Sequence, residues 1–486
     1  MAHHPPRTST AAQPSENELA KLGVAAAAQV IRTGEVTAET YVSALLDQAR
    51  IKADLNAFIT LDEQGALSAA RDADQARAKG QSAPLLGVPL GIKDSYLTAG
   101  LRTTLGVGAL KDFRPTEDAD AVSSLKAAGA IVLGKNNLVE LSYGLTGYNA
   151  PWGQAENPHA RGHMTGGSSS GSAVAVAARL VPATLGGDTI GSIRVPASLT
   201  GVIGFKPTTG RWPRGGVAPI SHTLDTTGVF ARSVEDCALI DQVVTNAPAT
   251  AEEIRDDLKG ARFAFAPRQY LNLVDPEVEA RFHGTLVRLA DAGAEIVEID
   301  LGEDFQELAL QTTWGLFFRE TKASLTEFLE RHTIPVSFEE LHAGLRPGIK
   351  DAWDHFVVPG AAGYLSEDAY RALTVARLAL KERMSAVFTR HGANALILPT
   401  TPCTAPVVDN QDRFTVAGQD VDFRVLANNT IPASGAGLPG ISLPIGLDDH
   451  HLPIGMEFDG PEGQDRALLA LAARVEKVLC AEASRS

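Results

Sequence analysis

The sequence predicts an α/β fold in which a large mixed, mostly parallel β-sheet is covered by helices on both faces. Short apolar runs of strand length alternate along the chain with amphipathic helical segments. The second half of the chain repeats the alternation seen in the first half. Alternation of this kind is typical of a sheet that buries its strands between two layers of helices.

The first half begins with helices and continues with short strands. The pattern is helical from Glu16, with an Ala-rich run to Ile31, and Thr37 is a suitable N-cap for a helix over residues 38–50. The elements expected next are strands at 55–61, 86–92 and 131–133, and helices at 119–128 and 170–179.

The second half resembles the first except for one aromatic stretch. The expected elements are strands at 262–266, 296–299, 395–398 and 441–445, and helices at 276–292 and 466–479. Between them, residues 305–365 carry clusters of Trp, Phe and Tyr side chains on helices and loops. We interpret this stretch as a cap or a wall of the substrate pocket, although aromatic residues at helical spacing more often belong to a plain core.

Composition and charge favour a soluble enzyme. The 486 residues are 44% hydrophobic, and we expect residues 1–15 to be a disordered tail and 16–486 to form a single domain. A net charge of -15 without a basic stripe argues against nucleic acid or an anionic membrane as partner. The N-terminus lacks the features of a signal peptide, and no apolar run is long enough for a membrane span. We therefore expect a cytoplasmic protein, a monomer or homodimer.

Cysteine and histidine usage gives no sign of a metal site. The three cysteines are far apart, with no CxxC spacing, and no HExxH pattern exists. Cys403 could act as a nucleophile, but a lone cysteine is more often a small buried hydrophobe. We expect neither a metal nor a cofactor.

The stretch over residues 166–196 is unlike the rest of the chain. It reads GGSSSGSAVAVAARLVPATLGGDTIGSIRVP, with glycines and hydroxyl side chains at both ends of an Ala/Val helix. Glycines at this density allow backbone N–H groups to approach a ligand closely, although a flexible Gly/Ser loop is the simpler interpretation. The second cluster lies between a candidate strand and a helix start, where free N–H groups favour negative charge.

These residues resemble the amidase signature family. Residues 166–172 and 186–196 match the family's two Gly/Ser elements, and 87–94, GVPLGIKD, matches its lysine element. Segments 137–144, 204–208 and 231–236 are also similar, so the resemblance spans nearly the whole chain after the tail. The segments GVAPISHTLDTTG and LPIGMEFDGPEGQDRALL are most similar to indoleacetamide and mandelamide hydrolases. The resemblance implies the amidase signature fold and a small-molecule amide, ester or carbamate substrate.

The resemblance also assigns roles to residues of this chain. It implies a Ser-cisSer-Lys triad in which Ser192 is the nucleophile, Ser168 follows a cis peptide after Gly167, and Lys93 is the base. Lys93 must be neutral to act, so we expect burial to depress its pKa. The implied oxyanion donors are the N–H groups of Thr189, Ile190 and Gly191. Ile190 stands where the family usually has glycine, so its side chain either narrows the acyl pocket or packs behind it.

Other residues are expected to shape or line the site. Gly167, Asp188 and Arg194 would hold the two serine loops in place. Candidates for lining the substrate pocket are Ser142, Tyr143, Gly144 and Arg211, although a surface role for Arg211 is equally consistent with the sequence.

Three functions remain open at this point. The first is a stand-alone hydrolase of carboxamides or anilides, which could also cleave esters and carbamates (urethanes) because each passes through a tetrahedral adduct. The second is an amidotransferase subunit of a glutamyl-tRNA-converting complex. The third is a non-enzymatic relative that uses the pocket for binding.

Overall fold

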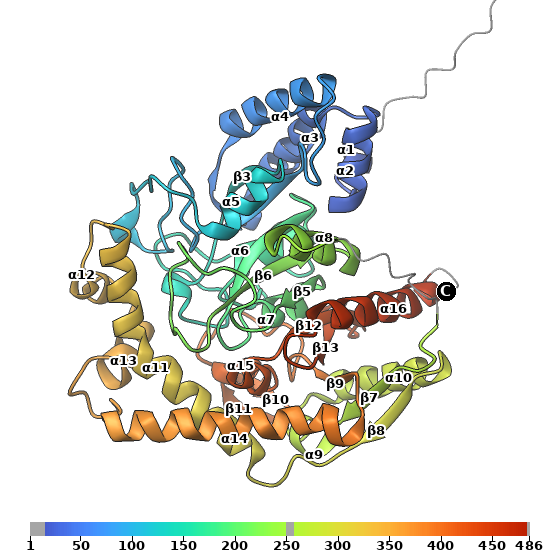
Figure 1. Ribbon diagram of the computed structural model, residues 1–486. Coiled ribbons are helices and arrows are strands. Elements are labelled where there is room, and N and C mark those ends of the chain that lie inside the picture. The colour runs from blue at the N-terminus through green and yellow to red at the C-terminus, as the bar shows by residue number, and fades with distance from the viewer. Residues whose placement is uncertain (1–14, 249–256, 484–486) are drawn as a thin grey trace, which may run out of the picture.

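The structure is a computed structural model that describes residues 15–248 and 257–483. The tail expected over residues 1–15 lies outside the described residues apart from Ser15. Figure 1 shows the strands gathered at the centre of the molecule with helices around them.

The described strands form an 11-stranded sheet and one separate hairpin. In spatial order the sheet consists of β1 (Phe58–Leu61), β3 (Ile131–Asn136), β2 (Pro89–Lys93), β4 (Ala183–Asp188), β6 (Thr226–Ala231), β5 (Ile203–Lys206), β12 (Gly440–Leu447), β13 (Pro453–Asp459), β9 (Ala395–Pro399), β7 (Arg262–Phe265) and β8 (Glu295–Glu298). The hairpin joins β10 (Arg413–Val416) to β11 (Gln419–Asp422).

The sheet is mixed, as expected, but it is not mostly parallel. The parallel pairs lie toward its two ends, where β2 pairs with β3 and β4, and β7 pairs with β8 and β9. The central pairs, from β4 through β6, β5, β12 and β13 to β9, are antiparallel. A short connection such as the one between β12 and β13 can only make an antiparallel pair, and apolar runs alone do not reveal strand direction.

Helices cover both faces of the sheet, as the sequence predicts. The described helices are α1 (Glu16–Leu19), α2 (Val24–Thr33), α3 (Ala38–Ile51), α4 (Glu63–Ala78), α5 (Asp120–Ala127), α6 (Ser170–Ala177), α7 (Arg194–Thr200), α8 (Val234–Val244), α9 (Pro267–Tyr270), α10 (Pro276–Asp291), α11 (Phe305–Arg331), α12 (Phe338–Ala343), α13 (Pro347–Phe356), α14 (Glu367–His391), α15 (Ile431–Ala436) and α16 (Asp465–Ala483).

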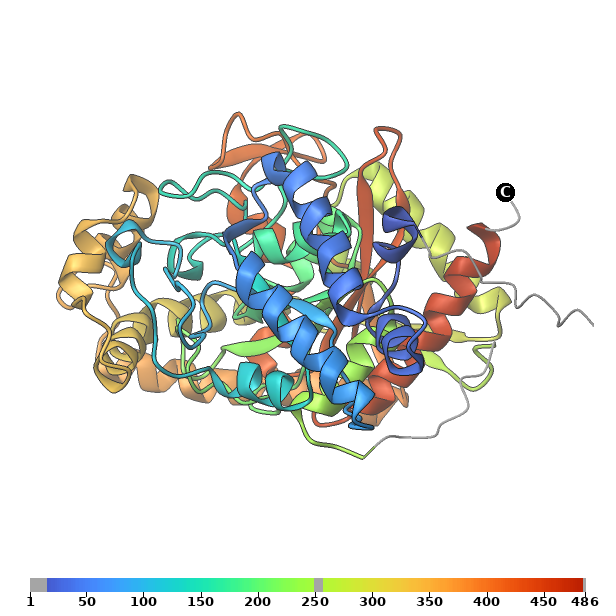
Figure 2. The same ribbon diagram turned by 90° about the horizontal axis from the view of Figure 1, so that it is seen from above.

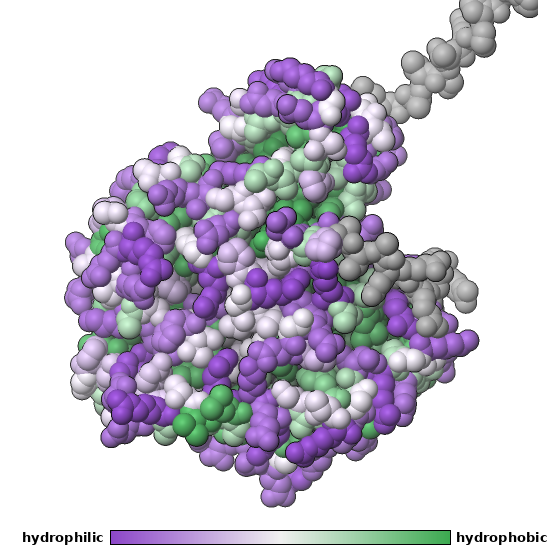
Figure 3. Space-filling model, viewed as in Figure 1, coloured by the Kyte–Doolittle hydropathy of each residue, from purple (hydrophilic) through white to green (hydrophobic). Residues whose placement is uncertain are grey.

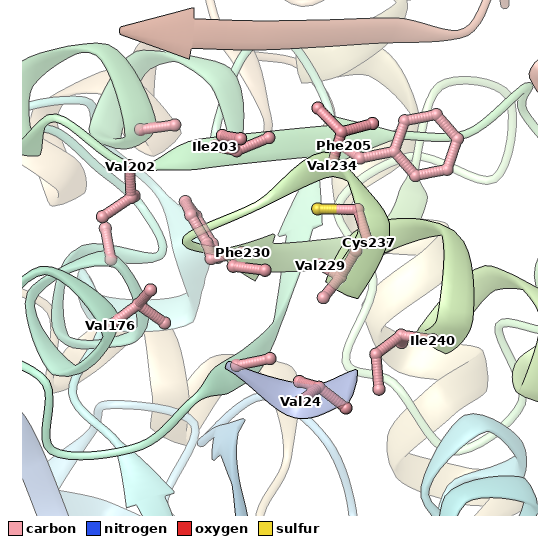
Figure 4. Packing of buried hydrophobic residues seen from close by; sticks show 14 of the residues in the cluster. Val24, Val176, Val202, Ile203, Phe205, Val229, Phe230, Val234, Cys237 and Ile240 are labelled. Atoms are coloured by element: carbon pink, nitrogen blue, oxygen red, sulfur yellow. The ribbon is translucent and has the colours of Figure 1, made fainter. Parts of the chain in front are cut away.

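Two hydrophobic clusters lie on opposite faces of the sheet. On β9, Ala395 and Ile397 belong to the cluster packed under α2, α3, α8, α10 and α16, whereas Leu396 and Leu398 belong to the cluster under α11, α14 and α15. This division follows from the alternation of side chains along a strand. Figure 4 shows part of the first cluster, to which β6 contributes Val229 and Phe230 and α8 contributes Cys237 and Ile240.

Most predicted elements are present, with shifted ends. Thr37 caps α3 as expected, since its hydroxyl accepts a hydrogen bond from the Thr40 N–H at 3.0 Å. The helical run expected to reach Ile31 is divided into α1 and α2, with Gly23 as the N-cap of the second helix. The strand expected over 86–92 begins at Pro89 because Gly87, with φ +81°, turns the chain just before it.

The cap segment, defined as residues 305–365, contains α11, α12 and α13. These helices lie at one side of the molecule in both Figure 1 and Figure 2, away from α16. The face shown in Figure 3 is largely hydrophilic, with hydrophobic side chains in scattered patches. The residues of the two large apolar clusters are buried, and the cap segment contributes aromatic side chains to one of them.

Candidate active site

Two parallel strands bring the predicted catalytic segments to one edge of the sheet. β2 ends at Lys93 and its parallel neighbour β4 ends at Asp188, so both chains leave the sheet at the same edge. The loop after β4 carries Ser192 and leads into α7. Ser168 lies just before α6, which packs against β4. The order and direction of the strands therefore bring Lys93, Ser168 and Ser192 to the same edge of the sheet.

Lys93 is buried and bonded to one of the two serines. Its side chain is 1% exposed, and its Nζ donates to Ser168 Oγ at 2.8 Å. Burial lowers the pKa of Lys93 to about 7, although the negative charges of Asp188 and Asp225 oppose this shift. A large fraction of the lysine is therefore the neutral amine near neutral pH, which is the form that accepts a proton.

Ser168 has the backbone that the resemblance implied. The Gly167–Ser168 peptide is cis, and the Ser168 carbonyl accepts a hydrogen bond from the Val139 N–H at 3.0 Å. A Cβ on Gly167 would lie 2.9 Å from Val139 Cγ2 and 3.0 Å from the Gly144 carbonyl oxygen. Glycine is required at 167 because the neighbouring segment packs directly on its backbone.

Asp188 and Arg194 hold the loop that carries Ser192. The Asp188 carboxylate accepts hydrogen bonds from the N–H groups of Gly191 at 2.7 Å and Ile193 at 3.2 Å, and pairs with Arg194 Nε at 3.0 Å. Burial alone would raise the pKa of Asp188, but Arg194, Lys206 and the Ile193 N–H together outweigh it, and the net pKa lies below the usual value. The loop is thus closed on a fully buried carboxylate that remains charged.

Arg194 is held in turn from the opposite side. Its guanidinium donates to the Glu457 carboxylate, to the Thr430 carbonyl at 3.0 Å and to Ser434 Oγ at 2.6 Å. Its exposed fraction is 0%, and every one of these partners comes from a distant part of the chain. The Ser192 loop is therefore anchored to β13 and α15 as well as to β4.

The three predicted oxyanion donors are not equivalent. The N–H of Gly191 is already bonded to Asp188, whereas within the described residues the N–H groups of Thr189 and Ile190 have no acceptor. Gly191 has φ +142°, a conformation that favours glycine, so its role in the loop is to make the turn. Two unpaired N–H groups beside the proposed nucleophile, those of Thr189 and Ile190, are available to a ligand.

Ser192 lies close to the other two residues without completing the chain of hydrogen bonds. Its carbonyl accepts a hydrogen bond from the Ser169 N–H at 3.3 Å, which ties it to the neighbour of Ser168. Across the described residues, no hydrogen bond joins the Ser168 and Ser192 hydroxyls. Catalytic hydrogen bonds are often long in the absence of substrate, so this geometry is compatible with proton transfer between the two serines once substrate is bound.

Two cavities adjoin these residues, and Ser142 borders both. The polar cavity, of about 300 Å³, is lined by Lys93, Ser95, Ser168, Asp188, Thr189, Arg214, His222, Asp225, Glu327, Phe328, Arg331 and His332 among others. The aromatic cavity, of about 220 Å³, is lined by Tyr143, Gly144, Leu145, Ile190, Ser192, Trp314, Phe317, Phe318, Ile349 and Phe356, with the charged Arg346, Asp412, Asp422 and Arg424. The proposed base and nucleophile thus face different cavities.

The cap segment forms one wall of the aromatic cavity. Phe318 stacks between Trp314 and Phe356, with ring centroids 5.5 Å and 4.6 Å away. Phe317 packs on Tyr143, whose hydroxyl lies 2.6 Å from Thr321 Oγ1 of α11. Ile190 is buried and is one of the residues that line this cavity.

The residues proposed to line the substrate pocket divide into two groups. Ser142, Tyr143 and Gly144 do lie at the aromatic cavity. Arg211 does not, because its guanidinium pairs with Asp241 at 2.6 Å and it lines neither cavity. Together with the Trp212 indole N–H, which donates to Asp241 at 2.8 Å, it has a structural role between a loop and α8.

Two further residues were not predicted from the sequence. Asp225 accepts a hydrogen bond from Thr189 Oγ1 at 2.7 Å and lines the polar cavity. Arg346 of the cap segment pairs with the buried Glu140 at 3.0 Å and lines the aromatic cavity. Asp225 lies within the family-like segment GVAPISHTLDTTG, but nothing in that segment alone shows which residue it faces.

The described part of the chain shows neither a metal cluster nor a membrane helix. Over residues 15–248 and 257–483, no cluster of three or more His, Cys, Asp or Glu side chains could hold a metal ion. Within the same ranges, no helix combines the length and the apolar character that crossing a membrane requires.

Comparison with known proteins gives consistent matches over nearly the whole chain. A family model described as Amidase matches residues 40–469. Mandelamide hydrolase from Pseudomonas putida is 37% identical over 487 residues, covering 96% of this chain and 93% of that protein. Indoleacetamide hydrolase from Pseudomonas savastanoi is 36% identical, covering 93% and 95%.

Two further matches are informative. A glutamyl-tRNA(Gln) amidotransferase subunit from Roseiflexus sp. is 35% identical, covering 95% of this chain and 97% of that protein. A solved structure described as an amidase superposes with a TM-score of 0.83 at 30% identity, covering 94% of this chain and 99% of the other.

Proposed function

The chain belongs to the amidase signature family and is an amide-hydrolysing enzyme, and from this premise we propose that it cleaves aromatic carboxamides through an acyl-enzyme on Ser192. Ser168 and Lys93 complete the triad. The observation that carries the assignment is the buried lysine, with a pKa of about 7, bonded at 2.8 Å to the serine of a cis peptide.

The first half of the reaction forms the acyl-enzyme. Neutral Lys93 accepts the proton of Ser168 as Ser168 accepts that of Ser192, and Ser192 Oγ attacks the amide carbonyl carbon. The carbonyl oxygen becomes an oxyanion that the N–H groups of Thr189 and Ile190 stabilise. The tetrahedral adduct then collapses, the C–N bond breaks, and the proton returns through Ser168 to the leaving amine.

The second half releases the acid. Water replaces the amine, gives a proton to the same relay, and attacks the ester carbon of the acyl-enzyme. The second adduct collapses with Ser192 as leaving group, and the relay returns the proton to its Oγ. Because esters and carbamates form the same adducts, we propose that they are also substrates, with preference decided by fit to the two cavities.

The aromatic cavity supports an aromatic acyl group. Ser192 and Ile190 lie at this cavity, so an acyl group bonded to Ser192 would extend toward the rings of Phe317 and Phe318. Aromatic rings pair favourably in stacked and edge-to-face arrangements. Two relatives are named for mandelamide and indoleacetamide. Both compounds are carboxamides whose acyl group carries an aromatic ring. The polar cavity, at Lys93 and Ser168, would receive the leaving amine.

The amidotransferase function is the second candidate, because one component of that complex is 35% identical to this chain. The two functions differ in whether partner proteins are required and in the character of the acyl pocket. A stand-alone amidase acts without partner proteins, and for aromatic amides its acyl pocket is expected to contain aromatic side chains, as the aromatic cavity does beside its four charged residues. The non-enzymatic alternative is set aside, since the chain is an amide-hydrolysing enzyme.

The test uses the purified chain alone with mandelamide, indole-3-acetamide and 4-nitroacetanilide, and measures ammonia or 4-nitroaniline. We expect steady turnover of the aromatic amides that disappears in Ser192→Ala. Hydrolysis of glutamine in preference to the aromatic amides, or turnover that appears only with added amidotransferase partners, would overturn the proposal.

A further inference from the structure

Asp225 lies beside the nucleophile loop because of the register of two strands. β4 and β6 are antiparallel, and Asp188 at the end of β4 pairs with Thr226 at the start of β6. The residue that follows Asp188 and the residue that precedes Thr226 are therefore neighbours across the same edge. These two residues are Thr189 and Asp225.

Both oxygens of the Asp225 carboxylate are used. Oδ1 accepts a hydrogen bond from Thr189 Oγ1 at 2.7 Å, and Oδ2 accepts from the N–H groups of Ile220 at 2.8 Å and Ser221 at 3.0 Å. The carboxylate therefore joins the 220–225 turn to the Thr189 side chain. An asparagine whose oxygen accepts from the two N–H groups would present its NH2 to Thr189 Oγ1, which reverses that hydrogen bond and removes the charge.

Asp225 lines the same cavity as the proposed base. Asp225 and Lys93 both line the polar cavity, and the charge of Asp225 raises the pKa of Lys93 against the larger lowering effect of burial. Burial raises the pKa of Asp225 itself to about 6, against the hydrogen bond from Thr189. The other charged or titratable groups lining this cavity are Asp188, Arg214, His222, Glu327, Arg331 and His332.

We propose that Asp225 is a positioning residue for the hydrolysis: it fixes the Thr189 side chain so that the Thr189 N–H points at the oxyanion. As a negative charge that lines the same cavity, it also acts on Lys93. The inference rests on the proposed function of Ser192, Ser168 and Lys93. Asp225 touches no reacting atom, so both of its effects are exerted through other residues, one through a hydrogen bond and one through its field.

The two effects separate in a set of variants. Asp225→Asn removes the charge and one acceptor, Thr189→Val removes only the hydroxyl, and Thr189→Ser keeps it. Asp291→Asn is the matched control, because it removes an equal charge from an exposed position at the end of α10. For each protein, kcat and KM are measured from pH 5 to 9 with mandelamide, and thermal unfolding shows whether the variant is folded.

We expect Asp225→Asn to lower kcat by about tenfold or more with little change in KM, as for a misplaced oxyanion donor. In the plot of kcat against pH, the rise on the acid side should also move to lower pH by about half a unit to one unit in this variant, since the Lys93 ammonium loses a nearby anion. We call this rise the acid limb. Thr189→Val should lower kcat without moving the limb, and Thr189→Ser should recover most of the loss. The double variant Asp225→Asn/Thr189→Val should lose no more kcat than the worse single variant.

An acid limb in Asp225→Asn that coincides with that of Asp291→Asn would overturn the inference. If Asp225→Asn fails to fold, equal losses in Thr189→Val and Thr189→Ser would overturn it instead. Failure of the proposed function is distinguishable, because the wild-type protein would then release no product or Ser192→Ala would remain active.

Discussion

The catalytic edge of the sheet and the cap segment are built from different interactions. At the catalytic edge, polar side chains such as Asp188 and Arg194 are fully buried, and Arg194 makes several hydrogen bonds to distant parts of the chain. In the cap segment, the wall of the aromatic cavity consists of rings such as Phe318 and Trp314, which are held by stacking. Bond cleavage needs groups fixed in angle and charge, whereas choosing an acyl group needs mainly shape. The comparison predicts that changes at the edge abolish turnover and changes in the cap redirect it.

Removal of the base should have the largest effect. We expect Lys93→Ala to lower kcat by about 10⁴-fold with the fold intact, because triad residues act as a unit. In the wild-type protein kcat/KM should rise about tenfold per pH unit below about 7, since only the neutral amine accepts a proton. The pH–rate profile of both proteins checks this. A variant that keeps the same rise with pH would exclude Lys93 as the titrating base.

Loss of the buried arginine should affect stability most. Arg194→Met leaves Asp188 and Glu457 as buried charges without their partner, and we expect a loss of about 3 to 5 kcal/mol in the free energy of unfolding. Denaturant unfolding measures it. Arg331→Met is the control, because its pair with Glu327 is exposed and is worth at most about 1 kcal/mol. Equal losses in the free energy of unfolding in both variants would contradict the claim that Arg194 and its buried carboxylate partners hold the Ser192 loop in place.

A change in the cap should be smaller and selective. Phe318→Leu removes the ring that stacks between two others, so kcat/KM for mandelamide should fall about tenfold, while that for acetamide stays within about twofold. Phe282→Leu makes the same replacement on the opposite face of the sheet and should lower stability without changing the ratio of the two substrates. Parallel losses for both amides in Phe318→Leu would show that the cap also positions the reacting groups.

The smallest effect is expected at Ile190, where the two regions meet. Ile190→Val removes one methylene from the wall of the aromatic cavity, so bulkier acyl groups should gain about threefold to tenfold in kcat/KM relative to mandelamide. Stability should fall by about 1 kcal/mol. A series of arylacetamides of increasing size measures the shift. No change in the ranking would place the acyl group away from Ile190.

The sequence was most informative where function depends on local pattern. Lys93, Ser168 and the Asp188 loop stand at strand and helix ends that can be recognised within short segments, and the structure brings these segments to one edge. Residues whose role depends on long-range pairing were missed. Asp225 contacts Thr189 only because of the β4–β6 register. Arg211 lies outside both cavities because it pairs with Asp241 of α8. The antiparallel centre of the sheet was missed for the same reason.

The central claim is a covalent acyl-enzyme on Ser192 that depends on Lys93, and mass spectrometry of the protein after reaction with an aryl phosphonate or sulfonyl fluoride tests it directly. The account predicts one adduct, located by peptide mapping on Ser192, that forms far more slowly in Lys93→Ala and is absent in Ser192→Ala. An adduct on another residue, or equal labelling with and without Lys93, would contradict it.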